Sequence, residues 1–139
     1  VGVQAPGHIV FAIDTSGSMS QNDIADIAAA VRSLRDIFHS KLTVLQSDAK
    51  IHSIEEYEAD DPTPIPQKTK VTGRGGTDFR PVFDFVKNSD GAPQLVIYAT
   101  DGFGNFPDYR PEVPCLWMLT ARSILEEKLP FGFAIKVGS

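Results

Sequence analysis

Five short apolar runs divide the chain at intervals. They cover residues 8–13, 41–45, 94–99, 115–119 and 131–137, and each is largely continuous rather than alternating with polar residues. Continuous runs of this length are typical of strands that are buried on both faces, as in a parallel sheet. The pattern therefore predicts that these five runs form the core strands.

A helical pattern lies between the first two runs. Apolar residues recur at three- and four-residue spacing from Ile24 to Phe38, which places them on one face of a helix. Ser20 and Asp23 have the spacing of an N-terminal capping box. We therefore expect a strand, a helix and a second strand over residues 8–45.

The segment after the second run is more polar. A turn around Asp48 is followed by a predicted strand at residues 51–58. A connection this short forces antiparallel pairing, and the charged side chains suit an edge strand. Residues 59–67 contain three prolines and residues 73–77 are glycine-rich, so both segments are predicted to be loops.

The second half of the chain repeats the alternation of helix and strand. A short amphipathic helix is predicted from Phe79 to Val86, and Asp90, Gly91 and Pro93 are expected to end it. Residues 123–129 are expected to form one more helix. The sum is a Rossmann-like α/β fold, with a mainly parallel sheet, one antiparallel edge strand and helices on both faces.

The bulk properties narrow the class of protein. The length of 139 residues fits a single domain, residues 1–139, and the absence of an initiator Met at Val1 suggests either a processed chain or a domain excised from a larger protein. A net charge of −5 argues against a nucleic acid or an anionic membrane as partner. No apolar run approaches the roughly 18 residues of a membrane span. The lone Cys115 cannot form an internal disulfide, so we expect a cytoplasmic protein.

Oxygen-bearing side chains follow the predicted strands where ligands bind in such sheets. Asp14, Ser16 and Ser18 come directly after the first strand, Thr77 follows a glycine pair, and Asp101 follows the strand at 94–99. Ligands bind beyond the carboxyl ends of parallel strands. If the first and fourth strands are neighbours, these side chains meet in one crevice.

Two carboxylates and three hydroxyls form a donor set made only of oxygen. Hard cations prefer oxygen, whereas zinc usually takes Cys or His ligands. Mg²⁺ takes six ligands at about 2.0–2.1 Å and keeps several waters. With so few anionic ligands the ion would keep much of its charge and attract an anionic oxygen from outside. The set therefore predicts a Mg²⁺ site, with Mn²⁺ or Ca²⁺ as alternatives.

Several residues near this set have a plainer role. Asp, Ser and Gly are common in strand-to-helix turns because they cap helices and accept unusual dihedral angles. Asp78 is expected to cap the following helix, and Phe103 and Phe106 either line the site or pack onto their own domain. The residues expected to support or border the site are Gly75, Gly76, Asp78, Gly102, Phe103 and Phe106.

The order of these motifs resembles the von Willebrand factor A (VWA) domain. Its metal-ion-dependent adhesion site is written Asp-x-Ser-x-Ser, then a distant Thr and a distant Asp. This chain has "DTSGS" at 14–18, "GGTD" at 75–78 and "TDG" at 100–102. The resemblance implies that Ser16, Ser18 and Thr77 bind the metal directly, while Asp14 and Asp101 act mainly through water. It also implies a first strand beside the fourth.

A closer resemblance is to the bacterial VWA-like domain at the C-terminal end of predicted metallopeptidase-like proteins. It rests on "TDGFGNFP", on the strand that contains Trp117 and on the terminal "PFGFAIKV". Only Gly138 and Ser139 follow the last run, so we expect a compact domain without the usual C-terminal helix. This likeness implies a site rather than a particular partner.

Three functions of different classes remain. The leading hypothesis is a non-enzymatic, cation-dependent protein-binding module in which a partner's Asp or Glu completes the metal shell. The second is a Mg²⁺-dependent phosphoryl-transfer or hydrolytic enzyme. However, Ser16 replaces the second acid of haloacid-dehalogenase phosphatases, Asp14 replaces the first glycine of G-x-S-x-G, and the Walker and dinucleotide loops are absent. The third is a metal-free structural interaction domain, in contact with other domains of a parent protein.

Overall fold

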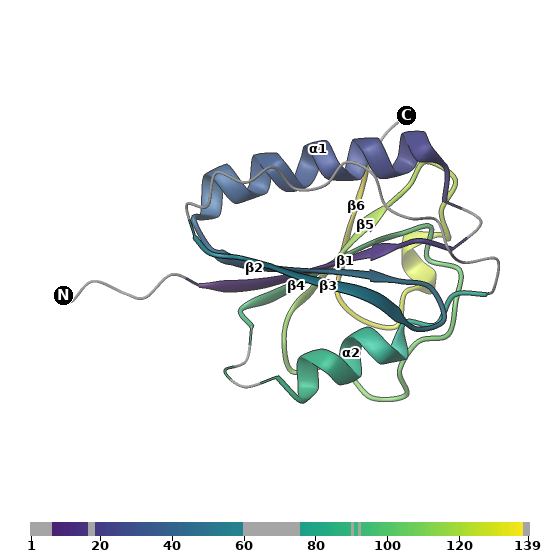
Figure 1. The fold of residues 1–139 in the computed structure, drawn as a ribbon. Helices are drawn as coiled ribbons and strands as arrows, with labels where there is room; N and C mark the ends of the chain where they lie inside the picture. Colours follow the sequence, from purple (N-terminus) through teal and green to yellow (C-terminus); the bar gives the residue numbers. More distant parts are fainter. Residues whose placement is uncertain (1–6, 17–18, 60–75, 90, 92, 138–139) are drawn as a thin grey trace.

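A mixed sheet with helices on both faces forms the centre of the structure (Figure 1). The computed structural model describes residues 7–16, 19–59, 76–89, 91 and 93–137. Its strands are β1 (His8–Asp14), β2 (Lys41–Ser47), β3 (Ile51–Tyr57), β4 (Leu95–Thr100), β5 (Cys115–Leu119) and β6 (Phe133–Lys136). Its helices are α1 (Gln21–Phe38), α2 (Arg80–Lys87) and the short 3₁₀ helix η1 (Glu126–Lys128).

The strand order is β3-β2-β1-β4-β5-β6. β1 pairs in parallel with β2 and β4, β5 pairs in parallel with β4 and β6, and β3 is antiparallel to β2. The predicted fold class, with a parallel sheet and one antiparallel edge, is confirmed. Because Ile13 is the register partner of Ala99, the chain leaves β1 and β4 at the same edge of the sheet.

Helix α1 covers one face of the sheet (Figure 1). Ile27, Ala28 and Val31 of the predicted apolar stripe are buried, and Phe11, Val44 and Ile97 of the strands belong to the same core. The predicted side chains of Ile24, Leu34 and Phe38 lie outside those that the structure describes.

The predicted capping box at the start of α1 is present. The Asp23 N–H donates to Ser20 Oγ at 3.0 Å, and the Ser20 N–H donates to Asp23 Oδ2 at 3.0 Å. Two donors that the first helical turn leaves without a partner are thereby satisfied. The box fixes where the helix begins after the loop that follows β1.

Aromatic side chains fill the opposite face, between the sheet and α2. The rings of Tyr98 and Trp117 stack at 5.3 Å, and Phe79 meets both rings edge-on at 5.1 and 5.3 Å. Such pairs contribute about 0.5–1.5 kcal/mol each beyond the burial of their area. Phe83 and Phe131 extend the cluster, and Trp117 Nε1 donates to the Phe131 carbonyl at 3.0 Å. This packing sets the position of α2 and of the residues just before it.

Two predictions about the C-terminal part are wrong. Residues 123–129 form only the single turn η1, because Leu125 and Leu129 are extended and the Ile124 N–H donates to the Asp101 carbonyl at 2.8 Å. β6 is not covered on both faces: it lies at the sheet edge, where Phe133 is 71% exposed and Ile135 46% exposed. The tertiary contact of Ile124 explains the missing helix, and the edge position of β6 explains its exposed side chains.

Some predicted loops lie outside the described residues. These are the proline-rich segment from residue 60 onward and the glycine-rich segment up to residue 75. Among the helices that the structure describes, none has the length and apolar character needed to cross a membrane.

The capping box leads to the first testable prediction. Ser20→Ala should lower the free energy of unfolding by about 1 kcal/mol, because it removes the acceptor for the Asp23 N–H. The control is Ser33→Ala, since Ser33 lies on the exposed side of the same helix and bonds only to the Ala29 carbonyl at 3.3 Å. Its effect should stay within about 0.5 kcal/mol. Urea denaturation measures both, and equal effects would show that the cap contributes nothing particular.

Candidate functional site

Asp14 ends β1 as a fully buried carboxylate. Its Oδ1 accepts the Ser16 N–H at 2.8 Å, and its Oδ2 accepts the Thr100 hydroxyl at 2.6 Å. Thr100 Oγ1 in turn accepts the Gly102 N–H at 3.0 Å. Asp14 therefore joins the loop after β1 to the loop after β4.

The electrostatic surroundings of Asp14 are unusual for a buried acid. Burial raises the pKa of Asp14, hydrogen bonds from Ser16 and Thr100 lower it in part, and the negative charge of Asp101 raises it further. Among the described residues no basic side chain forms an ion pair with Asp14. A buried charge without a paired counter-charge is expensive to maintain.

Asp101 lies directly after β4 and is 5% exposed. Its Oδ1 accepts the Phe103 N–H at 3.1 Å and its carbonyl accepts the Ile124 N–H at 2.8 Å. Gly102 has a φ of 84°, and a Cβ there would lie 2.2 Å from Ile124 Cγ2. The turn that follows Asp101 thus requires glycine at position 102.

Backbone hydrogen bonds of Thr77 and Asp78 hold Thr77 at this edge of the sheet. The Thr77 carbonyl accepts the Asn105 N–H at 3.1 Å, and the Asp78 N–H donates to the Asp48 carbonyl at 3.1 Å. A Cβ on Gly104 would lie 2.7 Å from the Thr77 carbonyl oxygen, so only glycine permits this approach. Thr77 is 8% exposed and lies between the loop after β4 and the β2–β3 turn.

Asp78 acts at the start of α2. Its Oδ1 accepts the Arg80 N–H at 3.0 Å, and the Arg80 guanidinium donates to both carboxylate oxygens, with Nη2 at 2.7 Å from Oδ2. These bonds hold the pKa of Asp78 below its ordinary value. The first residue outside α2 is Phe79, whose side chain makes no capping bond, and its backbone is already helical. Asp78 therefore serves as the cap of this helix.

Phe103 and Phe106 differ in exposure, since one ring faces solvent and the other packs onto its own domain. Phe103 is 57% exposed beside Asp101. Phe106 packs inward, with ring centroids 4.9 Å from Phe79 and 5.5 Å from Trp117. Of these two rings, Phe103 is the one that solvent reaches.

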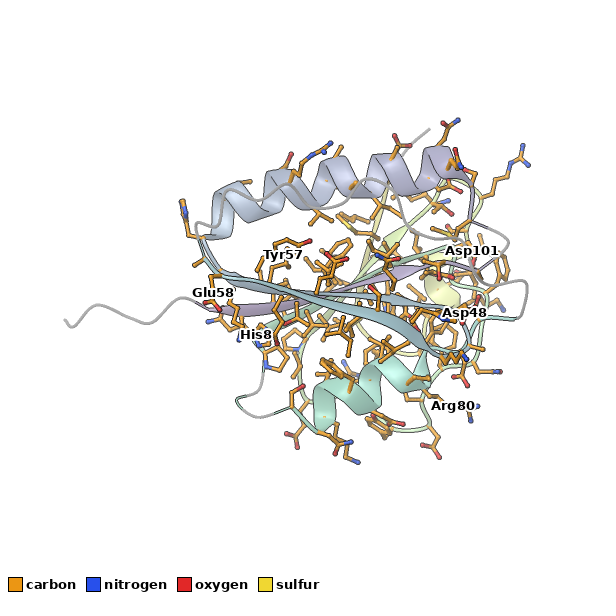
Figure 2. The ribbon with its side chains drawn as sticks, viewed as in Figure 1. His8, Asp48, Tyr57, Glu58, Arg80 and Asp101 are labelled. Carbon is orange, nitrogen blue, oxygen red and sulfur yellow. The ribbon has the colours of Figure 1, made fainter. Side chains whose placement is uncertain are left out.

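The structure groups Asp14, Ser16 and Asp101, and its backbone contacts place Thr77 beside the Asp101 loop. Figure 2 shows Asp101, Asp48 and Arg80 at one end of the sheet and His8 at the other. Ser18 and Gly75 lie outside the described residues, and a Cβ added at Gly76 would meet no atom of the described residues within 4 Å. The contributors that sequence reasoning missed are Asp48, Thr100, Gly104 and Asn105.

Of these four residues, only Thr100 has a sequence pattern that could have identified it. It adjoins Asp101 in "TDG", and a Thr at a strand end beside an acid is a natural donor to a neighbouring carboxylate. Gly104 and Asn105 belong to "GFGNFP", whose contacts depend on where Thr77 lies in the fold. No local pattern distinguishes these two residues from ordinary loop residues.

The donors fit a hard cation by their chemistry. The candidate ligands within the described residues are carboxylate and hydroxyl oxygens, which Mg²⁺, Mn²⁺ and Ca²⁺ accept. The described part of the chain contains no group of three or more His, Cys, Asp or Glu side chains that could hold a metal ion. A cation here would therefore depend on the hydroxyls of Ser16 and Thr77 as well as on the acids.

Several solved structures share the fold. They include a von Willebrand factor type A protein from Catenulispora acidiphila (TM-score 0.63, 13% identity, covering 97% of this chain and 39% of that one). The ArnB paralog VWA2 from Sulfolobus acidocaldarius aligns with TM-score 0.59 and 16% identity, over 96% of this chain and 42% of that one. The conserved hypothetical protein BatB from Bacteroides thetaiotaomicron aligns with TM-score 0.60 and 13% identity, over 82% and 66%.

The chain spans less than two thirds of the length of each of these three proteins. At such low identity the likeness establishes the fold alone. No curated protein sequence matches this chain. A profile of the family described as "VWA-like domain (DUF2201)" matches residues 9–138. The chain therefore belongs to the VWA-like domain (DUF2201) family.

Proposed function

We propose that this chain is a protein-interaction module that depends on a divalent cation. The cation is Mg²⁺, with Mn²⁺ or Ca²⁺ as alternatives, and an Asp or Glu side chain of a partner protein completes its shell. The proposed ligands, direct or through water, are Asp14, Ser16, Ser18, Thr77 and Asp101. The VWA-like fold favours an interaction module. The observation that carries the cation is the pair of buried acids without a basic partner among the described residues.

The electrostatics of this pair explain why a cation is favourable. Asp14 and Asp101 are both nearly inaccessible, and the charge of Asp101 adds to the cost of ionising Asp14. A divalent ion would offset both charges. Ser16 lies beside the Asp14 carboxylate, to which its N–H donates at 2.8 Å, and this supports its hydroxyl as a proposed ligand. Neutral hydroxyl ligands leave the ion with positive charge, which attracts an outside carboxylate.

An enzyme is the weaker candidate. A phosphatase or hydrolase at this site would need a general acid or base within reach of the reacting atoms. Ser16 stands where the haloacid-dehalogenase pattern has its second acid. His8 bonds to Thr43 at the opposite end of the sheet, and His52, near the site, is engaged by the Asp48 carboxylate at 2.7 Å. The residues at the site support binding rather than turnover.

The partner class follows from charge. A net charge of −5 favours a protein over nucleic acid or an anionic membrane.

Burial raises the pKa of the Cys115 thiol, so this lone cysteine is chemically inert and suits a cytoplasmic setting, which we include in the proposal. Other domains of a parent protein belong to the same class of partner.

The first test is a calorimetric titration of the metal-free protein with MgCl₂ and MnCl₂. We expect one site, and Ser16→Ala or Asp101→Asn should weaken binding at least about 10-fold because each removes an oxygen near the ion. The matched control is Asp26→Asn, which removes the same charge from the exposed side of α1. It should leave the affinity within about 2-fold. If the wild-type protein shows neither heat nor thermal shift at millimolar cation, the proposal is wrong.

The second test uses pH. Because the folded-state pKa of Asp14 is raised, its protonated form favours folding at low pH, and this stability is lost as pH rises from the unfolded pKa through the folded pKa. Cation binding requires the ionised form. We therefore expect Mg²⁺ to raise the melting temperature more at pH 7.5 than at pH 5. Asp14→Asn should remove this difference, and a cation effect that is equal at both pH values in the wild-type protein would contradict the assignment.

The third test distinguishes a carboxylate receptor from an enzyme. With Mn²⁺ bound, water proton relaxation reports the waters on the ion. Added acetate should displace one of them and lower the relaxation enhancement, because acetate mimics the partner's carboxylate. The same protein should not hydrolyse p-nitrophenyl phosphate. Hydrolysis that disappears in Asp14→Asn would establish the enzyme instead.

A further inference from the structure

Two buried hydroxyls lie beside Asp14, because Ser47 is its register partner on β2 and Tyr98 is the register partner of Ala12, two residues before it. They are Ser47 Oγ and the Tyr98 phenol, and neither has a hydrogen-bond partner within the part of the chain that is described. Both residues are 0% exposed. Leaving such groups unpaired in a protein interior is costly, so each requires an explanation.

The ring of Tyr98 is held firmly in place. On β4 its register partners are Ala12 of β1 and Trp117 of β5, and the three side chains share the α2 face of the sheet. The small Ala12 leaves space for the phenol, while Trp117 stacks at 5.3 Å and Phe79 contacts the ring edge at 5.1 Å. The hydroxyl position is thus fixed by aromatic packing.

Tyr98 shares its face of the sheet with Asp14, which lies two residues beyond Ala12, the register partner of Tyr98. Burial raises the pKa of Tyr98 far above its ordinary value, and the charges of Asp14 and Asp78 raise it further. The hydroxyl therefore keeps its proton and can donate it to an acceptor. Asp14 has lone pairs left for such a donor, because a carboxylate offers about four acceptor positions and the Ser16 and Thr100 donors do not fill them all.

Ser47 borders the same space from β2. Its carbonyl accepts the Thr15 N–H at 3.0 Å, which holds the strand end against the loop after β1. Ser47 is the register partner of Asp14, and its hydroxyl lowers the pKa of Tyr98, yet the two hydroxyls do not meet hydrogen-bond geometry. A water with these two hydroxyls and a carboxylate as partners would satisfy all of them.

We infer that Tyr98 is a positioning residue of the candidate site. Together with Ser47 it holds an ordered internal water, through which its hydroxyl donates to the Asp14 carboxylate. This support fixes the orientation of Asp14 from the protein side and leaves its outer face to the cation. The inference rests on the proposed function, because its effect is exerted on cation affinity.

The test compares Tyr98→Phe with Tyr109→Phe. The first variant deletes one buried oxygen and keeps the aromatic packing, whereas Tyr109 bonds to Asp84 at 3.1 Å, away from the site residues. We expect Tyr98→Phe to raise the Kd for Mn²⁺ about 10-fold, with the melting temperature of the metal-free protein unchanged or higher. Tyr109→Phe should leave the Kd within about 2-fold.

A merely structural role gives the opposite pattern. If Tyr98→Phe lowers the metal-free melting temperature and leaves the Kd unchanged, the inference is overturned while the cation site stands. Ser47→Ala provides a second variant should Tyr98→Phe fail to fold, and the same rise in Kd is expected. If the wild-type protein binds no cation, the proposed function is the part that fails.

A measurement without cation tests the water itself. In the metal-free protein, NMR cross-relaxation should connect a long-lived water to the Tyr98 ring protons, and Tyr98→Phe should remove the signal. Absence of this signal in the wild-type protein, with the Tyr98 hydroxyl donating directly to Ser47, would overturn the inference even if Mn²⁺ binds.

Discussion

The parallel pairing of β1 with β4 determines the electrostatics of the candidate site. It brings Asp14 and the residues that follow Thr100 to one edge of the sheet, so two carboxylates lie close together with little access to water. Hydrogen bonds from Thr100 and Ser16 stabilise the Asp14 charge only in part, since the pKa remains raised. Under the proposed function, the remaining electrostatic cost is what a bound cation would offset.

Packing on the far side of the sheet determines where Thr77 lies. Phe79 is two residues further along the chain, and its ring is fully buried among Tyr98, Phe106 and Trp117. Backbone bonds from Asn105 and Asp48 then tie residues 77–79 to two neighbouring loops. Hydrophobic burial of Phe79 therefore positions the site loop that carries Thr77, and the aromatic core and the candidate site are structurally coupled.

The sequence could predict features that depend on local pattern. Continuous apolar runs identified the strands, and the spacing of Ser20 and Asp23 identified the start of α1. It failed where a distant contact overrides local preference: Ile124 is tied to the Asp101 loop instead of continuing a helix, and β6 has a neighbour on only one side in the described sheet. The sequence shows the order of the acids and hydroxyls, but the close approach of Gly104 to Thr77 depends on the tertiary fold.

The same geometry assigns the cation a definite role under the proposed function. Backbone bonds from Thr15 to Ser47, from Asp78 to Asp48 and from Asn105 to Thr77 tie the described parts of these loops to their neighbours. The cation would thus change the charge of the edge more than its shape. Without it, Asp14 and Asp101 repel an acidic partner; with it, the same edge attracts one. The loss of binding on chelation would then come from a reversal of electrostatic sign, on a platform that is already in place.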